Sequence, residues 1–560
     1  MNNFNVLYTK RASEISETPW NFYPRPSLKR DSFFCLNGEW DFAVTKGELP
    51  ADFDQKIIVP YPIESVLSKI GKCFCDSDVF WYKKVFDFQK SSKRVLLHFG
   101  AVYQTCEIFL NGKKIGDNDD GYNPFCIDIS DFIKDTNILI VKVKNVLGDH
   151  IHPYGKSVRK RGGMWYTAVT GIWQTVWLEE VCDNFISDIK IDCNSTGADV
   201  FLCGDFNGYA FCEGEQYEVK NGRVRIEPKS PKLWSPEEPH LYNFSIVCGD
   251  DKIESYFALR TLEICEVNSL PRLCLNGKPY YFNGLLDQGY WPDGLFTPPT
   301  PEGFADDISA IKNLGFNMLR KHIKVEPELF YYECDRLGMI VFQDMVNNGD
   351  YSFLRDTLLP TFFSIRKNDK YLHSDNESRN AFTTCMKRTV SNLYNHPSIC
   401  AWTIFNEGWG QFCGDDMYEV LKSIDKSRFI DTASGWFLPK KSDFLSRHIY
   451  FKKLKNHKNG KPYFISEFGG YSYKMPNHVF NTKQTYGYGK FDNADNYEKA
   501  VCSLFEKEVL PLVKQGLCAS VYTQVSDVED ETNGLLTYDR LPKLKTDCLL
   551  KICERIKEEI

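Results

Sequence analysis

Residues 300–342 read TPEGFADDISAIKNLGFNMLRKHIKVEPELFYYECDRLGMIVF and contain two successive units of helix, glycine and strand. Thr300-Pro301 has the pattern of a helix N-cap followed by proline at the first helical position. Apolar residues then recur at helical spacing, at Phe304, Ile308, Ile311 and Leu314. Gly315 is expected to end this helix, and residues 316–320 are predicted to form a buried strand.

The same unit recurs along the rest of the chain. A second helix ends at Gly338 and a fourth at Gly516, and a third carries Phe382, Met386, Val390 and Leu393 on one face. The strands predicted after these helices are residues 339–342, 399–405 and 517–523. Such repetition over about 290 residues predicts a (β/α)₈ TIM barrel. An open doubly wound sheet is the alternative, but no G-x-G-x-x-G follows a strand here.

The chain before residue 268 has the pattern of β-structure. Short alternating runs are separated by Asn-Gly turns, as in Leu36-Asn37-Gly38-Glu39-Trp40 and around Asn111-Gly112. We therefore expect a multidomain chain: an N-terminal β-sandwich of jelly-roll type over residues 1–182, an immunoglobulin-like β-sandwich over 183–267 and the catalytic barrel over 268–560.

Composition excludes several classes of protein. The 560 residues carry 68 Lys and Arg against 75 Asp and Glu, a net charge of −7 that does not suggest binding to nucleic acid or a membrane surface. No run of about 18 apolar residues occurs. The N-terminus has no basic segment followed by an apolar one, so we expect a cytoplasmic protein, with a homo-oligomer left open.

The 20 cysteines are scattered, and we expect them to be reduced thiols. Neither C-x₂-C nor H-E-x-x-H is present, so the sequence predicts no metal site and no cofactor.

Polar residues follow several of the predicted barrel strands, where barrel enzymes carry their catalytic groups. One strand ends in Asn406-Glu407 and another in Glu467. The other polar groups at strand ends are Arg320-Lys321-His322, Gln343-Asp344, His448 and Tyr450. Two carboxylates at one barrel mouth are what glycoside hydrolysis requires, although a single one is often only a helix cap or an arginine partner. The aromatic residues Trp402, Trp409 and Tyr471 lie near this pair in the sequence.

The residues around both carboxylates resemble a known family. Asn395-His396-Pro397-Ser398-Ile399, Trp402 and Asn406-Glu407 resemble the acid/base motif of glycoside hydrolase family 2, which contains β-galactosidases and β-glucuronidases. Phe464-Ile465-Ser466-Glu467-Phe468-Gly469 resembles its nucleophile strand. Other stretches that resemble the family, in the same order, are Pro24-Arg25-Pro26, Leu36 to Phe42, Gly171 to Glu179, Phe257-Ala258-Leu259-Arg260 and Leu275-Asn276-Gly277-Lys278-Pro279.

The resemblance implies a retaining mechanism on a carbohydrate substrate. Glu407 would be the general acid/base and Glu467 the nucleophile, while Asn406 would donate to the sugar 2-hydroxyl and Tyr450 would orient Glu467. His322 and Arg320 would support the nucleophile and the sugar, with an Arg320–Asp344 ion pair as the purely structural alternative. The remaining residues considered for the sugar site are Asp287, which could instead cap a turn, His448, Trp291, Trp436 and Tyr522.

One motif departs from the family. Glucuronidases of the family carry Asn-x-Lys near the last strand, whereas Asn533-Gly534-Leu535 has leucine in place of the lysine. This argues against a uronic acid, although Lys321 or Arg540 could substitute. We expect a retaining exo-β-glycosidase with β-D-galactosides as the leading substrates. The alternatives are another glycone (β-glucuronide, β-mannoside or arabinopyranoside) and a carbohydrate-binding protein without catalysis.

Overall fold

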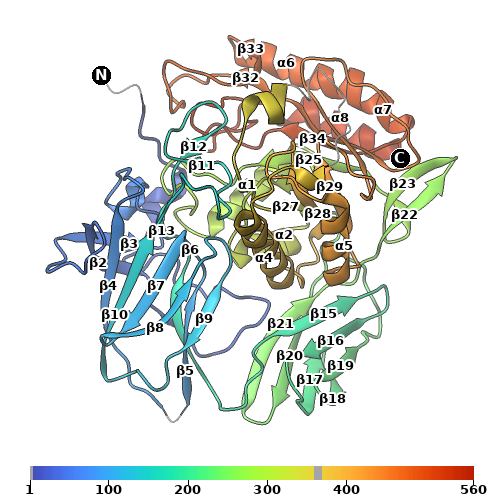
Figure 1. The fold of residues 1–560 in the computed structure, drawn as a ribbon. Helices are drawn as coiled ribbons and strands as arrows, with labels where there is room; N and C mark the ends of the chain where they lie inside the picture. The colour runs from blue at the N-terminus through green and yellow to red at the C-terminus, as the bar shows by residue number, and fades with distance from the viewer. Residues whose placement is uncertain (1–3, 92, 359–368) are drawn as a thin grey trace.

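The computed structural model describes residues 4–91, 93–358 and 369–560. Two β-sandwiches and a barrel follow one another along the chain (Figure 1). The predicted fold class is therefore confirmed. No helix in these ranges is both long and apolar enough to cross a lipid bilayer.

The first sandwich has a six-stranded sheet and a four-stranded sheet. The larger sheet has the order β3-β2-β4-β10-β7-β8, and its strands are Gln55–Val59, Gly38–Thr45, Val79–Asp87, Thr136–Lys144, Thr105–Leu110 and Lys113–Asn118. The smaller sheet has the order β1-β14-β5-β9, with strands Phe34–Cys35, Val176–Val181, Arg94–Phe99 and Phe125–Asp128. Alternate residues of β7 and β10 are buried, as expected for strands with one face on a core.

The second sandwich also consists of two antiparallel sheets. One has the order β15-β16-β19, formed by Ile189–Cys193, Ala198–Leu202 and Arg223–Ile226. The other has the order β18-β17-β20-β21, formed by Glu215–Val219, Gly208–Cys212, Tyr242–Cys248 and Asp251–Phe257. Their inward-facing apolar side chains form a core of their own.

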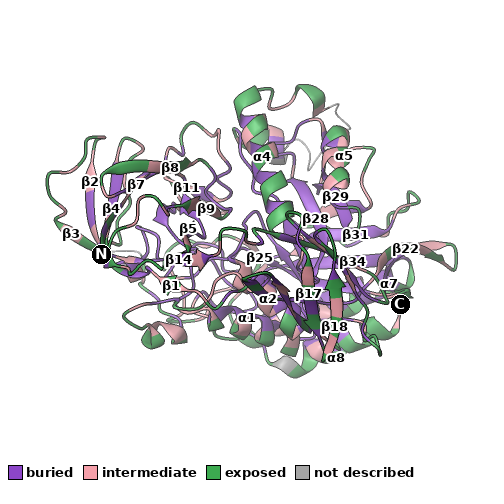
Figure 2. Cartoon of the chain, turned by 90° about the horizontal axis from the view of Figure 1, so that it is seen from below, coloured by how far each residue is buried: buried purple, intermediate pink, exposed green. Residues whose placement is uncertain are grey.

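Eight parallel strands form the barrel. Their order is β29-β28-β27-β26-β25-β34-β31-β30, and β29 and β30 at its two ends contact each other. The strands, in chain order from β25, are Phe282–Asp287, Met318–Lys321, Ile340–Asp344, Ile399–Asn406, Phe429–Ser434, Leu445–Ile449, Tyr463–Gly469 and Leu517–Thr523. The helices around them are α1 Glu302–Asn313, α2 Glu328–Leu337, α4 Asn376–Asn392, α5 Gly414–Ile424, α6 Ala494–Leu504, α7 Leu510–Lys514 and α8 Thr546–Glu558. Figure 2 shows the strands buried and the outer faces of α4 and α5 exposed.

The first helix begins one residue later than the sequence suggests. Its N-cap is Pro301 rather than Thr300, and the Thr300 hydroxyl has no hydrogen-bond partner among the described residues. Gly315 and Gly338 follow α1 and α2 in left-handed conformations, as predicted.

A hairpin packs against the barrel interior. It consists of β22 Leu262–Val267, β23 Leu270–Leu275 and the short β24 Lys278–Pro279, and its Leu273 and Leu275 belong to the same apolar cluster as the barrel residues. Cys265 and Cys274 form a disulfide across this hairpin. The expectation that every cysteine is a free thiol is therefore wrong for this pair, because the strand register brings the two side chains together.

The second sandwich is held to the barrel at Gly338. This residue has φ +73°, and a Cβ added there would lie 2.6 Å from the carbonyl oxygen of Pro236, in the segment that also carries the fully buried Trp234. The indole nitrogen of Trp234 donates to the carbonyl of Asp335, two residues before the end of α2. Only glycine fits this contact without displacing backbone.

We predict that Gly338→Ala lowers the free energy of unfolding by about 2–3 kcal/mol, because a side chain there meets backbone as well as adopting a left-handed conformation. Gly460→Ala is the matched control: its φ is +83°, but nothing lies within 4 Å of the added Cβ. It should cost about 1 kcal/mol. Urea unfolding of both variants measures the difference. Equal losses would contradict the assigned role of the Pro236 contact.

Candidate active site

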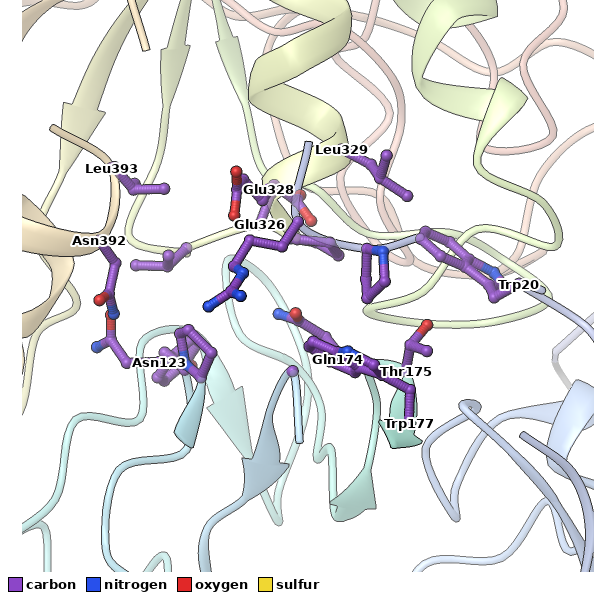
Figure 3. Close-up of a pocket in the computed structure, with 17 residues that line it drawn as sticks. Trp20, Asn123, Gln174, Thr175, Trp177, Glu326, Glu328, Leu329, Asn392 and Leu393 are labelled. Carbon is purple, nitrogen blue, oxygen red and sulfur yellow. The ribbon is translucent and has the colours of Figure 1, made fainter. Parts of the chain in front are cut away.

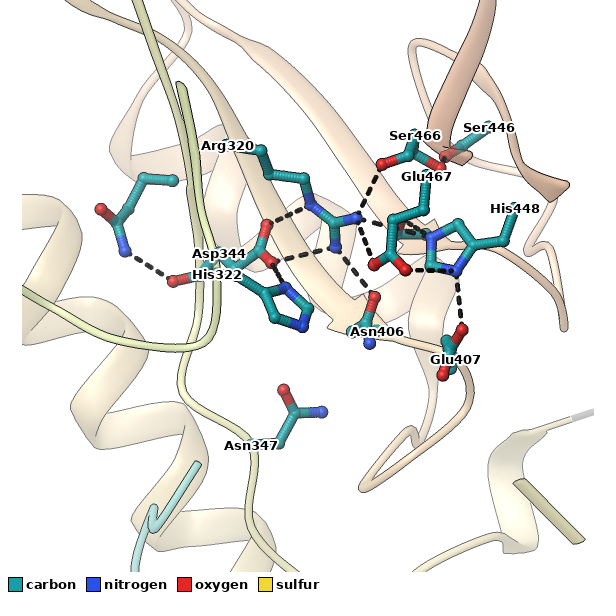
Figure 4. Close-up of polar contacts among 12 residues, drawn as sticks. Arg320, His322, Asp344, Asn347, Asn406, Glu407, Ser446, His448, Ser466 and Glu467 are labelled. Carbon is teal, nitrogen blue, oxygen red and sulfur yellow. Dashed lines mark hydrogen bonds and ion pairs between the residues drawn. The ribbon is translucent and has the colours of Figure 1, made fainter. Parts of the chain in front are cut away.

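The carboxyl ends of five barrel strands bring the predicted polar residues together (Figure 4). Arg320 and Asp344 are supplied by β26 and β27, Asn406 by β28, His448 by β30 and Glu467 by β31. His322 and Glu407 come directly after β26 and β28. Parallel strands end at one face of a barrel, so residues far apart in sequence become neighbours there.

Arg320 is the centre of this cluster and is completely buried. Its Nε donates to Asp344 Oδ1 at 3.0 Å, and its Nη2 lies 2.9 Å from Asp344 Oδ2. Nη1 donates to Glu467 Oε1 at 3.0 Å, and Nη2 to Asn406 Oδ1 at 2.8 Å. One guanidinium therefore fixes Glu467 and leaves the amide NH₂ of Asn406 free to donate elsewhere.

Glu467 is held in its ionised form. Burial alone would raise its pKa, but the neighbouring His448 and Arg320 outweigh burial and lower the pKa to about 2. The hydroxyl of Tyr450 also donates to Glu467 Oε2 at 2.7 Å and lies 2.9 Å from Thr523 Oγ1. A charged, oriented carboxylate is suited to act as a nucleophile.

Glu407 lies beside Glu467 with a strained backbone, since its φ is +53°. Its Oε1 is 2.7 Å from Nδ1 of His448, whose Nε2 is 2.7 Å from the Ser434 hydroxyl. One oxygen of each glutamate and a nitrogen of His448 all lie within 4.8 Å of one another. These three side chains could hold a cation, but it would occupy the space between the two carboxylates.

His322 and Asp344 form a second layer around Arg320. Nδ1 of His322 lies 2.8 Å from Asp344 Oδ2. Burial lowers the pKa of His322 to about 4, so the ring is neutral near neutral pH and Nε2 is left as a hydrogen-bond acceptor. The Arg320–Asp344 ion pair of the structural alternative and an ion pair with Glu467 are both present.

Trp436 lies next to the catalytic cluster. Its ring is 5.5 Å from that of His448, and its Nε1 donates to the carbonyl of Glu407 at 3.0 Å. Tyr522 lies elsewhere: it packs against Phe468 and Phe505 in the layer between strands and helices, so its expected place in a sugar pocket is wrong. Neighbouring residues of a strand point to opposite sides, and Thr523 takes the inward position beside Tyr450.

Four other residues considered for the substrate have partners within the protein. Asp287 accepts from the Gly289 amide at 2.9 Å, as the turn-capping alternative expects. It also accepts from Lys321 Nζ at 2.5 Å. Lys321 is shared with Glu326. Arg540 pairs with Asp307 and stacks on the ring of Trp291, which is itself buried.

The sequence did not single out Ser434, Tyr488 or Glu531. Ser434 ends β29, so the strand-end argument could have found it. Tyr488 packs 4.6 Å from the ring of Tyr450. Glu531 lies in the loop after β34, where the charge of Glu467 contributes to raising its pKa. Neither residue has a local pattern that marks it.

A loop of the first sandwich docks on the barrel loop after β27. The amides of Tyr154 and Gly155 both donate to the carbonyl of Asn347, at 3.0 and 3.1 Å, and the Tyr154 hydroxyl donates to the carbonyl of Gly349. A separate cavity of about 60 Å³ lies between the same two domains (Figure 3). Trp20, Gln174 and Glu328 line it, together with other residues of the interface, and neither Glu407 nor Glu467 does.

Comparison with known proteins agrees with this architecture. Residues 266–557 match the model "Glycosyl hydrolases family 2, TIM barrel domain", 68–158 match "Glycosyl hydrolase 2 galactose-binding domain-like" and 206–260 match "Glycosyl hydrolases family 2". A β-galactosidase of Thermoanaerobacter pseudethanolicus is 24% identical over 70% of this chain and 54% of its own length. A β-glucuronidase of Bacteroides fragilis is 22% identical over 70% of this chain and 58% of its own. The chain thus spans little more than half the length of these relatives.

Solved structures share the fold at low sequence identity. A β-glucuronidase from an uncultured Clostridium species superposes with a TM-score of 0.75 at 17% identity, covering 96% of this chain and 99% of the other. A β-galacturonidase from Eisenbergiella tayi, bound to galacturonate, superposes with a TM-score of 0.68 at 19% identity, covering 95% and 98%. Because the family's barrel model alone matches more than half of the residues, this chain belongs to glycoside hydrolase family 2.

Proposed function

We propose that this protein is a retaining exo-β-glycosidase in which Glu467 is the nucleophile and Glu407 the acid/base. The observation that carries the proposal is the approach of the two carboxylates to within 4.8 Å. Retaining enzymes hold their carboxyl groups about 5–5.5 Å apart, whereas inverting enzymes separate them by about 6.5–9.5 Å to admit a water molecule. The spacing favours retention.

In the first step, Glu467 attacks the anomeric carbon while protonated Glu407 gives its proton to the departing oxygen. The glycosidic bond breaks, the aglycone leaves as an alcohol and the sugar is esterified to Glu467. In the second step, Glu407 takes a proton from water, the water oxygen attacks the anomeric carbon, and the ester bond breaks. Asn406, oriented by Arg320, is placed to donate to the 2-hydroxyl as the transition state develops.

For the glycone, β-D-galactosides are the leading proposal. Two residues could replace the missing glucuronidase lysine as partners of a uronate carboxylate, Lys321 and Arg540. Both already have carboxylate partners within the protein: Lys321 pairs with Asp287 and Glu326, and Arg540 pairs with Asp307. This supports a neutral sugar. The second candidate is a uronide, which is favoured by the names of the structural neighbours, β-glucuronidase and β-galacturonidase.

A panel of 4-nitrophenyl glycosides tests the proposal. We expect turnover of the β-D-galactoside with the β-anomer as first product, detected by NMR, and no turnover of the α-galactoside. Faster turnover of the β-glucuronide, β-mannoside or α-L-arabinopyranoside would keep the mechanism and replace the glycone. Sugar binding without turnover of any glycoside would show a carbohydrate-binding protein instead.

We predict that Glu467→Ala abolishes hydrolysis and that azide restores release of nitrophenol, with a glycosyl azide of inverted configuration as product. Azide fits the space of the lost carboxylate and attacks the same face of the sugar. Glu419→Ala is the control: this exposed carboxylate pairs with Lys441, and its removal should leave hydrolysis unchanged. Full activity of Glu467→Ala would refute the nucleophile assignment.

We predict that Arg320→Met moves the acidic limb of the pH profile of kcat/KM to higher pH. In the wild type, Glu467 has a pKa of about 2 and remains ionised as the pH falls below the ordinary carboxyl range. Loss of the guanidinium raises this pKa, so the nucleophile becomes protonated, and activity falls, at a higher pH. Arg320→Lys keeps the charge and should shift the limb less. An unchanged limb in Arg320→Met would contradict the electrostatic role.

A further inference from the structure

The docked loop of the first sandwich carries a lysine to the barrel. Gly155 has φ +58°, and a Cβ there would lie 2.8 Å from the carbonyl oxygen of Ile323, just beyond β26. The next residue, Lys156, is half-buried, and its carbonyl accepts from the Tyr166 amide at 3.0 Å. Its Nζ lies 5.5 Å from the centroid of the Tyr166 ring. The loop is thus fixed against the strand end that supplies His322.

Lys156 differs from the other cations near the barrel mouth. Arg320 pairs with Asp344 and Glu467. Arg161, from the same sandwich loop, pairs with Glu529 and Asp530. Within the described residues, by contrast, no carboxylate oxygen lies within 4 Å of Lys156 Nζ, and Nζ donates no hydrogen bond. An ammonium held in this way has donors available for a ligand.

Glu531 is the acidic residue that Tyr166 connects to this lysine. It is only 4% exposed, and its Oε2 accepts from the Tyr166 hydroxyl at 3.0 Å and from Gln524 Nε2 at 2.8 Å. Its Oε1 accepts no hydrogen bond from the part of the chain that the structure describes. Tyr166 therefore links the lysine and the glutamate: its ring lies by the ammonium, and its hydroxyl is on the carboxylate.

Electrostatics connects both residues to the catalytic cluster. Burial raises the pKa of Glu531, the charge of Lys156 opposes that rise, and the charge of Glu467 adds to it. Lys156 also contributes to lowering the pKa of His322. The contacts agree with this: Glu531 accepts from Gln524, which follows Thr523, and the Thr523 hydroxyl lies 2.9 Å from the Tyr450 hydroxyl that donates to Glu467. Lys156 follows Gly155, which lies against the carbonyl of Ile323, the residue after His322.

We propose that Lys156 and Glu531 are specificity-determining residues, a donor and an acceptor that bind neighbouring hydroxyl groups of a neutral glycone on the side remote from the anomeric carbon. This inference rests on the proposed glycosidase function. A vicinal diol matches the pair because one hydroxyl can accept from the ammonium while its neighbour donates to Glu531 Oε1. A uronate carboxylate at the same place would lie beside the buried Glu531 carboxylate and be repelled by it.

The test combines protein variants with deoxy substrates. kcat and KM are measured for the wild type, Lys156→Met and Glu531→Gln on 4-nitrophenyl β-D-galactoside and its 3-, 4- and 6-deoxy analogues. If another glycoside is turned over fastest in the panel, its own deoxy series replaces these. Lys160→Met is the matched control, because Lys160 is an exposed lysine of the same loop. Circular dichroism and the thermal midpoint show whether each variant folds.

We expect Lys156→Met to lower kcat/KM about 10- to 100-fold on the parent glycoside, and Lys160→Met to leave it unchanged. With the wild type, kcat/KM for one deoxy analogue should be lower than for the parent glycoside by a similar factor. With Lys156→Met, the same analogue should be hydrolysed nearly as well as the parent, because the variant already lacks the contact to that hydroxyl. For Glu531→Gln, removal of the neighbouring sugar hydroxyl should likewise cause little further loss of kcat/KM. Additive losses at all three positions, in variants that fold, would overturn the proposal.

Three other outcomes distinguish failure of this inference from failure of the proposed function. A wild type that hydrolyses uronides faster than neutral glycosides, and loses this preference in Lys156→Met, would show that the lysine binds a carboxylate and would overturn the hydroxyl assignment. A wild type that hydrolyses no glycoside would refute the proposed function, and this inference with it. A wild type active on neutral glycosides, with Lys156→Met equally active, would refute the inference alone.

Discussion

The active site depends on one buried positive charge. Arg320 has no exposed surface, and an isolated guanidinium in the barrel interior would be highly unfavourable. Two carboxylates on different strands, Asp344 and Glu467, compensate it, and Asn406 takes a further donor. The same ion pairs that compensate the charge of the buried arginine therefore keep Glu467 ionised and fix its orientation.

The arrangement around Arg320 also separates the properties of the two glutamates. Glu467 lies deep, 6% exposed, with Arg320 and Tyr450 on its oxygens. Glu407 is less buried and contacts His448, which in turn contacts Ser434. Hydrogen bonds and positive charge favour the ionised form of a carboxyl, which is the form that the proposed nucleophile Glu467 requires.

Much of the fold could be predicted from the sequence because the barrel is built from local units. Each helix–glycine–strand repeat shows its own periodicity, and Gly315 and Gly338 lie where helices end. The two carboxylates could be placed for the same reason, as polar residues that end apolar runs. The position of Tyr522 could not be predicted. Every residue of its strand is buried, so the sequence does not show which side chains point into the barrel. The Cys265–Cys274 bond depends on hairpin register, and Lys156 and Glu531 on the docking of a loop 375 residues away in the chain.

The docking of Tyr154 and Gly155 on the carbonyl of Asn347 has an evolutionary consequence. The two carboxylates proposed to act on the glycosidic bond belong to the barrel, whereas the loop that carries Tyr154 and Gly155 belongs to a separate β-sandwich. A barrel and a sandwich can accumulate changes independently, provided that the backbone hydrogen bonds between them are kept. Under the proposed function, exchange of loops within the sandwich would change which sugar is bound, while the barrel would keep the reaction.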